Sequence, residues 1–185
     1  MNEREELIQK AMSIDAVKDL YACVSEQSPI TIKSIGKGPW GSTTENGQTT
    51  ISVAPTQWPS ESLSHELLHA KLKLLGYRQY STVCSMNNDQ GLLKSIVEAL
   101  DNELQHHRMF TEFLTMGFNP IHFYFDGDTD AYRTIRKEIK LMGPSTHVGQ
   151  FFLKFVTVIA PGGRGQSNNP RRWIDHYPHS RLTRL

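Results

Sequence analysis

Apolar residues recur three and four positions apart in several stretches of the chain, as they do along one face of an α-helix. The longest such stretch ends before Gly117, a residue type that commonly stops a helix. Most of the C-terminal half carries this helical pattern. The predicted helices cover residues 2–14, 15–24, about 60–75, about 89–116 and 129–142.

Other stretches carry the period-two alternation of a half-buried β-strand. Residues 30–35 alternate in this way, and residues 48–54 do so directly after Asn46-Gly47, a strong hairpin-turn signal. The aromatic run over residues 121–125 fits either a strand or the start of a helix. Together these patterns predict an α+β fold with a small mixed or antiparallel sheet.

Composition indicates a soluble globular protein. The 185 residues suit one domain with a sizeable core, and 38% hydrophobic with 21% charged residues is ordinary for that class. A net charge of +1 gives no overall field that would attract nucleic acid or a membrane. Cys23 and Cys84 are too few for a disulfide framework, and neither a signal peptide nor a membrane span is visible. We therefore expect a cytoplasmic protein, with its oligomeric state left open.

The composition changes near residue 161 to a Gly-, Asn- and Arg-rich segment. This change predicts a single domain over residues 1–160 and a mobile basic tail over residues 161–185. The tail has five arginines and one acidic residue, Asp175, so it could contact nucleic acid or another acidic partner. A solvated tail is the favoured interpretation, and nucleic acid is not expected as the main partner.

The sequence His-Glu-Leu-Leu-His begins at residue 65 inside the predicted helix 60–75. Residues four apart lie on the same face of a helix, so His65 and His69 can direct ring nitrogens at one metal ion. Glu66 can then reach a water at that ion without being a ligand. The spacing is that of a zinc site in which the glutamate acts as general base.

The alternative is a pair of buried histidines on an ordinary core helix. A helix is well supported here, because Pro59, Ser60 and Glu61 suit its first turn and Gly76 suits its end. The apolar stripe of this helix consists of Leu63, Leu67, Leu68, Leu72 and Leu75. With this context, zinc binding is the favoured interpretation.

The predicted helix 89–116 is expected to supply the third ligand. At about 100° per residue, its apolar stripe centres near Leu100, with Glu103 about 60° from that centre and His107 about 20° from it. A carboxylate on an apolar face is costly unless it is paired or binds a metal, so Glu103 is the preferred ligand. His107 could orient a ligand, be the ligand itself, or be a core histidine, and His106 faces more to the side.

His65-Glu-Leu-Leu-His69, followed after 33 intervening residues by Asn102-Glu103, resembles the gluzincin group of zinc peptidases. Members of that group carry the third ligand as a glutamate on a second helix, often preceded by asparagine. The ImmA/IrrE-type metallopeptidases are similar in size and in their strand-then-helix order. The resemblance covers about residues 47–107 and implies a zincin-like fold.

The chain also departs from these families. Thermolysin-like enzymes have an aspartate four residues after the ligand glutamate, where this chain has His107. Many ImmA/IrrE-type proteins carry a further histidine at the place of Lys73. The metzincin pattern is excluded, because Leu72 and Leu75 stand where its glycine and third histidine would be.

The resulting functional prediction is a zinc-dependent peptidase, most simply an endopeptidase, acting on a peptide or protein. His65, His69 and Glu103 would hold Zn²⁺, and Glu66 would take a proton from the attacking water. The strand 48–54 could lie along the rim of the cleft and pair with an extended peptide, or be an ordinary half-buried strand. Candidate donors to the oxyanion are His122, Tyr124, Tyr132 and His147.

The rival prediction is a non-catalytic binding or regulatory module with a closed, structural zinc site. His106 or His107 would then fill the fourth position beside His65, His69 and Glu103. Glu66 would be a surface or ion-paired acid.

Overall fold

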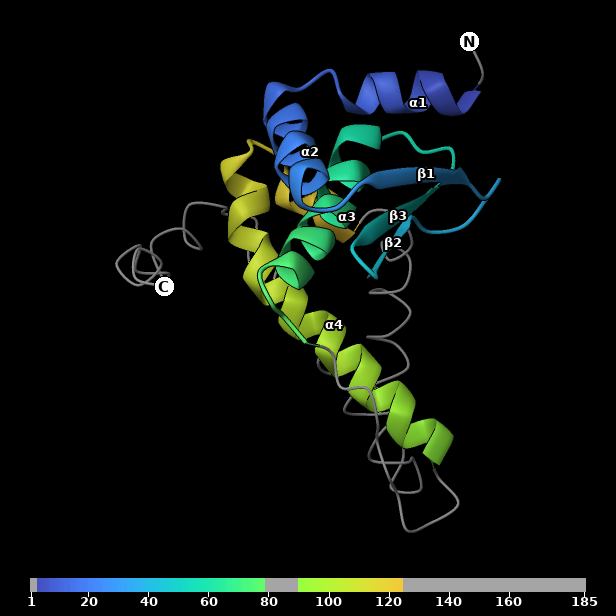
Figure 1. Cartoon of the computed structure of the whole chain (residues 1–185), viewed down its shortest axis with the longest axis vertical. Helices are drawn as coiled ribbons and strands as arrows, with labels where there is room; N and C mark the ends of the chain where they lie inside the picture. Colours follow the sequence, from blue (N-terminus) through green and yellow to red (C-terminus); the bar gives the residue numbers. More distant parts are fainter. Residues whose placement is uncertain (1–2, 79–89, 125–185) are drawn as a thin grey trace.

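A computed structural model describes residues 3–78 and 90–124 (Figure 1). It confirms an α+β fold, in which every helix and strand expected within these residues is present. The elements are α1 (Glu3–Ala11), α2 (Asp15–Gln27), β1 (Ile30–Ser34), β2 (Gly41–Glu45), β3 (Gln48–Val53), α3 (Pro59–Leu74), α4 (Gln90–Thr115) and the 3-10 helix η1 (Pro120–Tyr124). The helix predicted over 129–142, the apolar segment 147–159 and the boundary at residue 161 lie outside the described residues.

The three strands form a mixed sheet in the order β1-β3-β2, with β1 parallel and β2 antiparallel to β3. The Asn46-Gly47 turn joins β2 to β3, and both residues have positive φ, 51° and 75°. That conformation is what a two-residue hairpin requires, and it confirms the predicted turn. Strand β2 was not predicted, because its sequence GSTTE lacks an apolar alternation.

The position of β3 corrects the expectation that its backbone groups are free to bind a peptide. β3 is the central strand, so β1 and β2 pair with it on both sides. Its side chains alternate in burial, with Thr49, Ile51 and Val53 inward. β3 is therefore a half-buried structural strand, the alternative interpretation.

Helix α3 is the centre of the described core. It contacts α1, α2, α4 and β2, and Figure 1 shows it between α2 and the sheet. Leu63, Leu67, Leu68 and Ala70 are at most 1% exposed. The helix ends at Leu74, and Gly76 (φ +90°) forms the turn after it. The amides of Gly76 and Tyr77 donate back to the carbonyls of Lys73 and Leu72.

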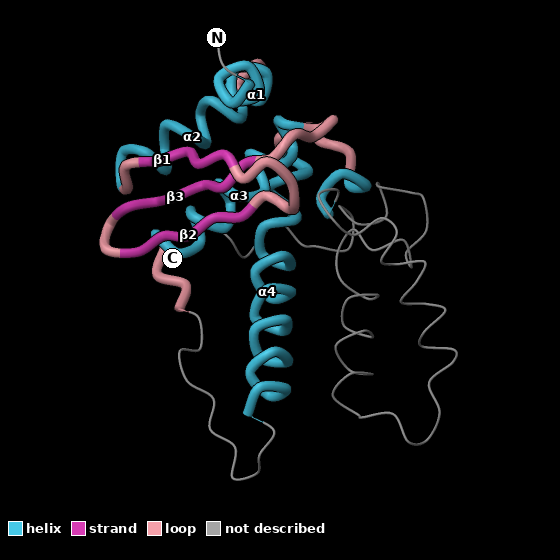
Figure 2. The backbone as a smooth tube through the Cα atoms, turned by 90° about the vertical axis from the view of Figure 1, so that its right-hand side faces the viewer, coloured by secondary structure: helices cyan, strands magenta, loops and turns pink. Residues whose placement is uncertain are grey.

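Helix α4 has two parts with different surroundings. Its N-terminal part extends away from the sheet in both views, whereas its C-terminal part packs beside α3 (Figures 1 and 2). Met109, Phe110 and Phe113 of this second part are at most 5% exposed. An ion pair of 2.6 Å between Lys71 Nζ and Glu112 Oε1 also joins the two helices. Among the described residues, no helix is both long enough and apolar enough to cross a bilayer.

Two leucines of the same helical segment provide a test of this packing. Leu67 is fully buried, whereas Leu75 at the end of α3 is 70% exposed. We expect Leu67→Ala to lower the free energy of unfolding by about 2–5 kcal/mol, because it opens a cavity in the core. Leu75→Ala should change it by less than about 0.5 kcal/mol. Urea unfolding followed by circular dichroism measures both, and equal losses would contradict the packing of α3.

Candidate metal centre

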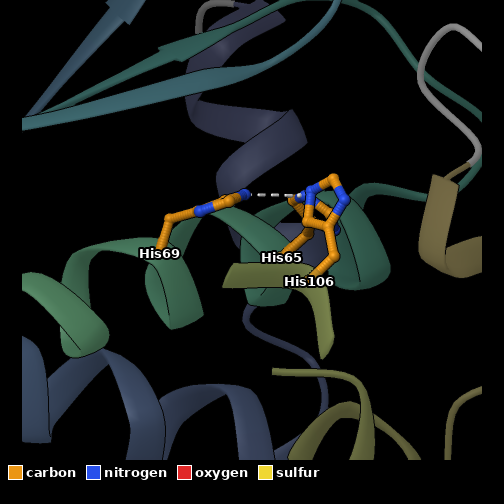
Figure 3. A group of neighbouring side chains, drawn as sticks. All are labelled: His65, His69 and His106. Atoms are coloured by element: carbon orange, nitrogen blue, oxygen red, sulfur yellow. Dashed lines mark hydrogen bonds between the residues drawn. The ribbon is translucent and has the colours of Figure 1, made fainter. Parts of the chain in front are cut away.

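Three histidines from two helices converge beside the core, where His106 is buried and His65 and His69 are half-buried. His65 and His69 come from α3 and His106 from α4 (Figure 3), and one ring nitrogen of each lies within 4.8 Å of the others. Their ring centroids are 4.9, 4.9 and 5.2 Å apart. Neutral imidazoles are common zinc ligands, so this group can hold a metal ion.

The spacing within the pair on α3 fits a single small ion. The Nε2 atoms of His65 and His69 are 3.1 Å apart. Two nitrogens bound tetrahedrally to zinc at 2.0–2.1 Å would be about 3.3–3.4 Å apart. A shift of a few tenths of an ångström would therefore accommodate zinc between the two rings. The two side chains converge as the His-x-x-x-His spacing predicts.

His106 points toward the pair on α3 because it lies on the buried face of the C-terminal part of α4. Met109, Phe110 and Phe113 are three, four and seven residues after it and face the core. His106 lies on the same face and is 4% exposed. The stripe centred near Leu100, used for the prediction, is about 120° away from His106 around the helix.

The other two α4 candidates lie outside the group of three. Leu104 is 55% exposed and His107 is exposed, so that side of α4 faces away from the core. Glu103 is buried, and its Oε2 is 3.6 Å from Nδ1 of His106. Glu103 therefore lies next to the third histidine, and in the proposal below His106 takes the ligand role predicted for Glu103.

Aromatic side chains enclose the histidines. The ring of Phe123 from η1 lies 4.8 Å from His65 and 5.4 Å from His106, centroid to centroid. Phe123 also packs against Phe110 and Phe113 at 5.1 and 5.0 Å. This apolar wall excludes water from one side of the group and strengthens electrostatic interactions within it.

Burial keeps the three imidazoles neutral. It lowers the pKa of His65 and of His106 well below the usual range, and in both cases the neighbouring histidines lower it further. Burial also lowers the pKa of His69, and the hydrogen bond between its Nδ1 and Oε1 of Gln105 opposes this by raising the pKa. A neutral imidazole has a lone pair for a metal, so the ligating form is the one that the site favours.

The surroundings of the pair on α3 include several buried polar atoms. Nδ1 of His65 is buried and makes no hydrogen bond of ordinary geometry within the described part of the chain. Nδ1 of His69 lies 2.9 Å from Oε1 of Gln105. Glu66, which follows His65 on α3, is 7% exposed.

One of the four predicted oxyanion donors is within the described side chains. Nδ1 of His122 lies 2.9 Å from Oε1 of Glu61, and its ring stacks on Trp58 at 3.8 Å. Glu61 is one helical turn before His65, so this pair adjoins the three histidines. The side chain of Tyr124, and Tyr132 and His147 altogether, lie outside the described residues.

Comparison with protein-family models, with curated proteins and with solved structures gives no match for this chain. The sequence carried a signal for His106 in the apolar residues downstream of it, 109, 110 and 113.

Adjacent histidines on α4 allow a matched test of the ligand set. We expect His106→Ala to weaken zinc binding more than about 100-fold, beyond the 10–100-fold typical of a residue that only orients a ligand. His107→Ala should bind zinc as the unaltered protein does, because His107 is exposed. Competition with a chromogenic chelator measures both affinities.

Glu103→Gln belongs in the same series. Because Glu103 lies beside His106, we expect a loss within that 10–100-fold range. A larger loss for Glu103→Gln than for His106→Ala would return the third-ligand role to Glu103.

Proposed function

We propose that this chain is a zinc-dependent hydrolase, and most specifically a peptidase, with His65, His69 and His106 as the metal ligands. The observation that carries the proposal is the convergence of three neutral imidazoles from α3 and α4 within 4.8 Å. Glu66, adjacent to the first ligand in a His-Glu-x-x-His sequence, adds the general base that hydrolysis requires. Three protein ligands leave a fourth coordination position, as in catalytic zinc sites.

The residues of the chain have separable roles in this proposal. Zinc, when bound, supplies a Lewis acid that polarises a carbonyl and makes water acidic enough to react near neutral pH. Glu66 accepts a proton from the attacking water and returns it to the leaving amine. Phe123 and its aromatic neighbours keep one side of the site dry. His122, held by Glu61, is the described candidate for hydrogen bonding to the developing oxyanion.

A zincin-like fold is part of the same proposal. The order of a small mixed sheet, then the helix with the histidine pair, then a second helix with the third ligand supports it. A histidine as third ligand separates this chain from the gluzincin pattern, in which a glutamate has that role. The substrate class, peptide or protein, and the cytoplasmic setting stay predictions from the sequence.

The buried Glu103 beside His106 supports a second candidate function. If its carboxylate filled the fourth position, the site would be closed, and the zinc would stabilise a binding module. Zinc removal would then lower the melting temperature, and Glu66 would have no chemical role. The substitution of Glu66 separates the two candidates.

We expect Glu66→Gln to keep its zinc and to lose hydrolysis by a factor of about 10²–10⁴, the usual contribution of a general base. The measurement compares new peptide N-termini in a cell-derived proteome treated with either protein. Glu98→Gln is the matched control, because the Glu98 carboxylate is 63% exposed on α4. Cleavage by Glu66→Gln at the rate of the unaltered protein would reject the peptidase.

A further inference from the structure

Gln105 connects His69 to Asp101 and, through it, to Tyr77. Gln105 and Asp101 are buried and Tyr77 is half-buried. Nδ1 of His69 is 2.9 Å from Oε1 of Gln105, a side chain that is only 2% exposed. Glutamine has both donor and acceptor atoms, so this contact alone does not say which atom carries the hydrogen. The contacts that Gln105 makes with Asp101 determine which atom carries the hydrogen.

Asp101 determines the orientation of the Gln105 amide. Nε2 of Gln105 donates to Oδ2 of Asp101 at 2.9 Å, and the hydroxyl of Tyr77 donates to Oδ1 at 2.8 Å. Asp101 is 4% exposed, and a carboxylate has only acceptor atoms. The amide nitrogen of Gln105 must therefore face Asp101, which leaves its oxygen facing His69.

The orientation of Gln105 in turn selects the tautomer of His69. Because Oε1 of Gln105 can only accept, Nδ1 of His69 must carry the hydrogen. Nε2 of the neutral ring then has the lone pair, and this atom faces His65 at 3.1 Å. The ring is held in the form that binds a metal through Nε2.

Local structure explains how these residues meet. Tyr77 follows Gly76, and the turn that ends α3 directs the chain there through the bond from the Tyr77 amide to the Leu72 carbonyl, 3.0 Å. Asp101 and Gln105 are four residues apart on α4 and so lie on one face. The hydrogen bonds thus lead from Tyr77, just after α3, to Asp101 and Gln105 on α4, and from Gln105 to His69 on α3.

We propose that Gln105 and Asp101 are positioning residues that preset the tautomer and direction of His69, with Tyr77 holding the Asp101 carboxylate. The consequence for metal affinity rests on the proposed zinc site, whereas the tautomer itself does not. An amide between ring and carboxylate orients the histidine without placing a full negative charge directly against it.

Nitrogen NMR of the ¹⁵N-labelled, metal-free full chain tests the tautomer directly. We expect His69 to show a protonated Nδ1 and an unprotonated Nε2 at neutral pH, with its signals assigned by their loss in His69→Ala. A protonated Nε2 on His69 in the unaltered protein would overturn the proposal.

Asp101→Asn gives the sharpest variant, because it keeps the shape of the side chain. Its amide can donate to Oε1 of Gln105, which lets the Gln105 amide turn and present its nitrogen to His69. We expect the tautomer of His69 to reverse and zinc affinity to fall 10–100-fold. A purely structural role would not reverse the tautomer, so an unchanged tautomer in Asp101→Asn would also overturn the proposal.

Gln105→Leu removes the acceptor and should leave His69 as a mixture of tautomers. Gln9→Leu, the same change at an exposed site on α1, should keep the tautomer of the unaltered protein. If the tautomers behave as expected but the chain binds no zinc, the proposed function fails while the positioning stands. If zinc binds but Asp101→Asn leaves His69 unaltered, the positioning fails alone.

Discussion

The contact between α3 and the C-terminal part of α4 is the interaction on which the candidate site depends. Neither helix can assemble the site alone, because α3 contributes two imidazoles and α4 the third. The interface joins the two helices by apolar packing and also by the Lys71–Glu112 ion pair and the bond between His69 and Gln105. A slide of one helical turn, about 5.4 Å, would separate His106 from the pair on α3.

Placing several polar side chains in such an interface costs free energy unless each finds a partner. The described interface meets this condition in part through Tyr77, Asp101 and Gln105, whose polar atoms satisfy one another. Burial lowers the pKa of His65 and of His106, which favours the neutral rings, and Phe123 packs against both. This environment disfavours protonated histidines. It suits three neutral imidazoles, whose lone pairs could bind one metal cation.

Local patterns were enough to predict most of the described elements. The helical stripe around residues 60–75 placed His65 and His69 on one face, and the Asn46-Gly47 turn defined a hairpin strand. Strand β2 was not predicted, because its side chains show no apolar alternation. Backbone pairing with β3 stabilises it instead. Predicting it would have required knowledge of its partner.

The third histidine illustrates a different limit. The apolar stripes of the two parts of α4 lie about 120° apart around the helix. Averaging over the whole helix favoured the face of Leu100, whereas His106 lies on the face that Met109 and Phe113 turn toward the core. Only the part of α4 that packs on α3 decides which residue enters the site, and this is a tertiary property. Likewise, the connection from Tyr77 to Gln105 joins residues from two elements, and no spacing in the sequence marks it.

The most direct measurement is a crystal structure of the zinc-loaded full chain, with diffraction recorded on both sides of the zinc absorption edge. We expect one anomalous peak about 2.0–2.1 Å from a ring nitrogen of each of His65, His69 and His106, with a fourth ligand that is not protein. A zinc ion held by the Glu103 carboxylate with His106 turned away, or no zinc between the three rings, would contradict it.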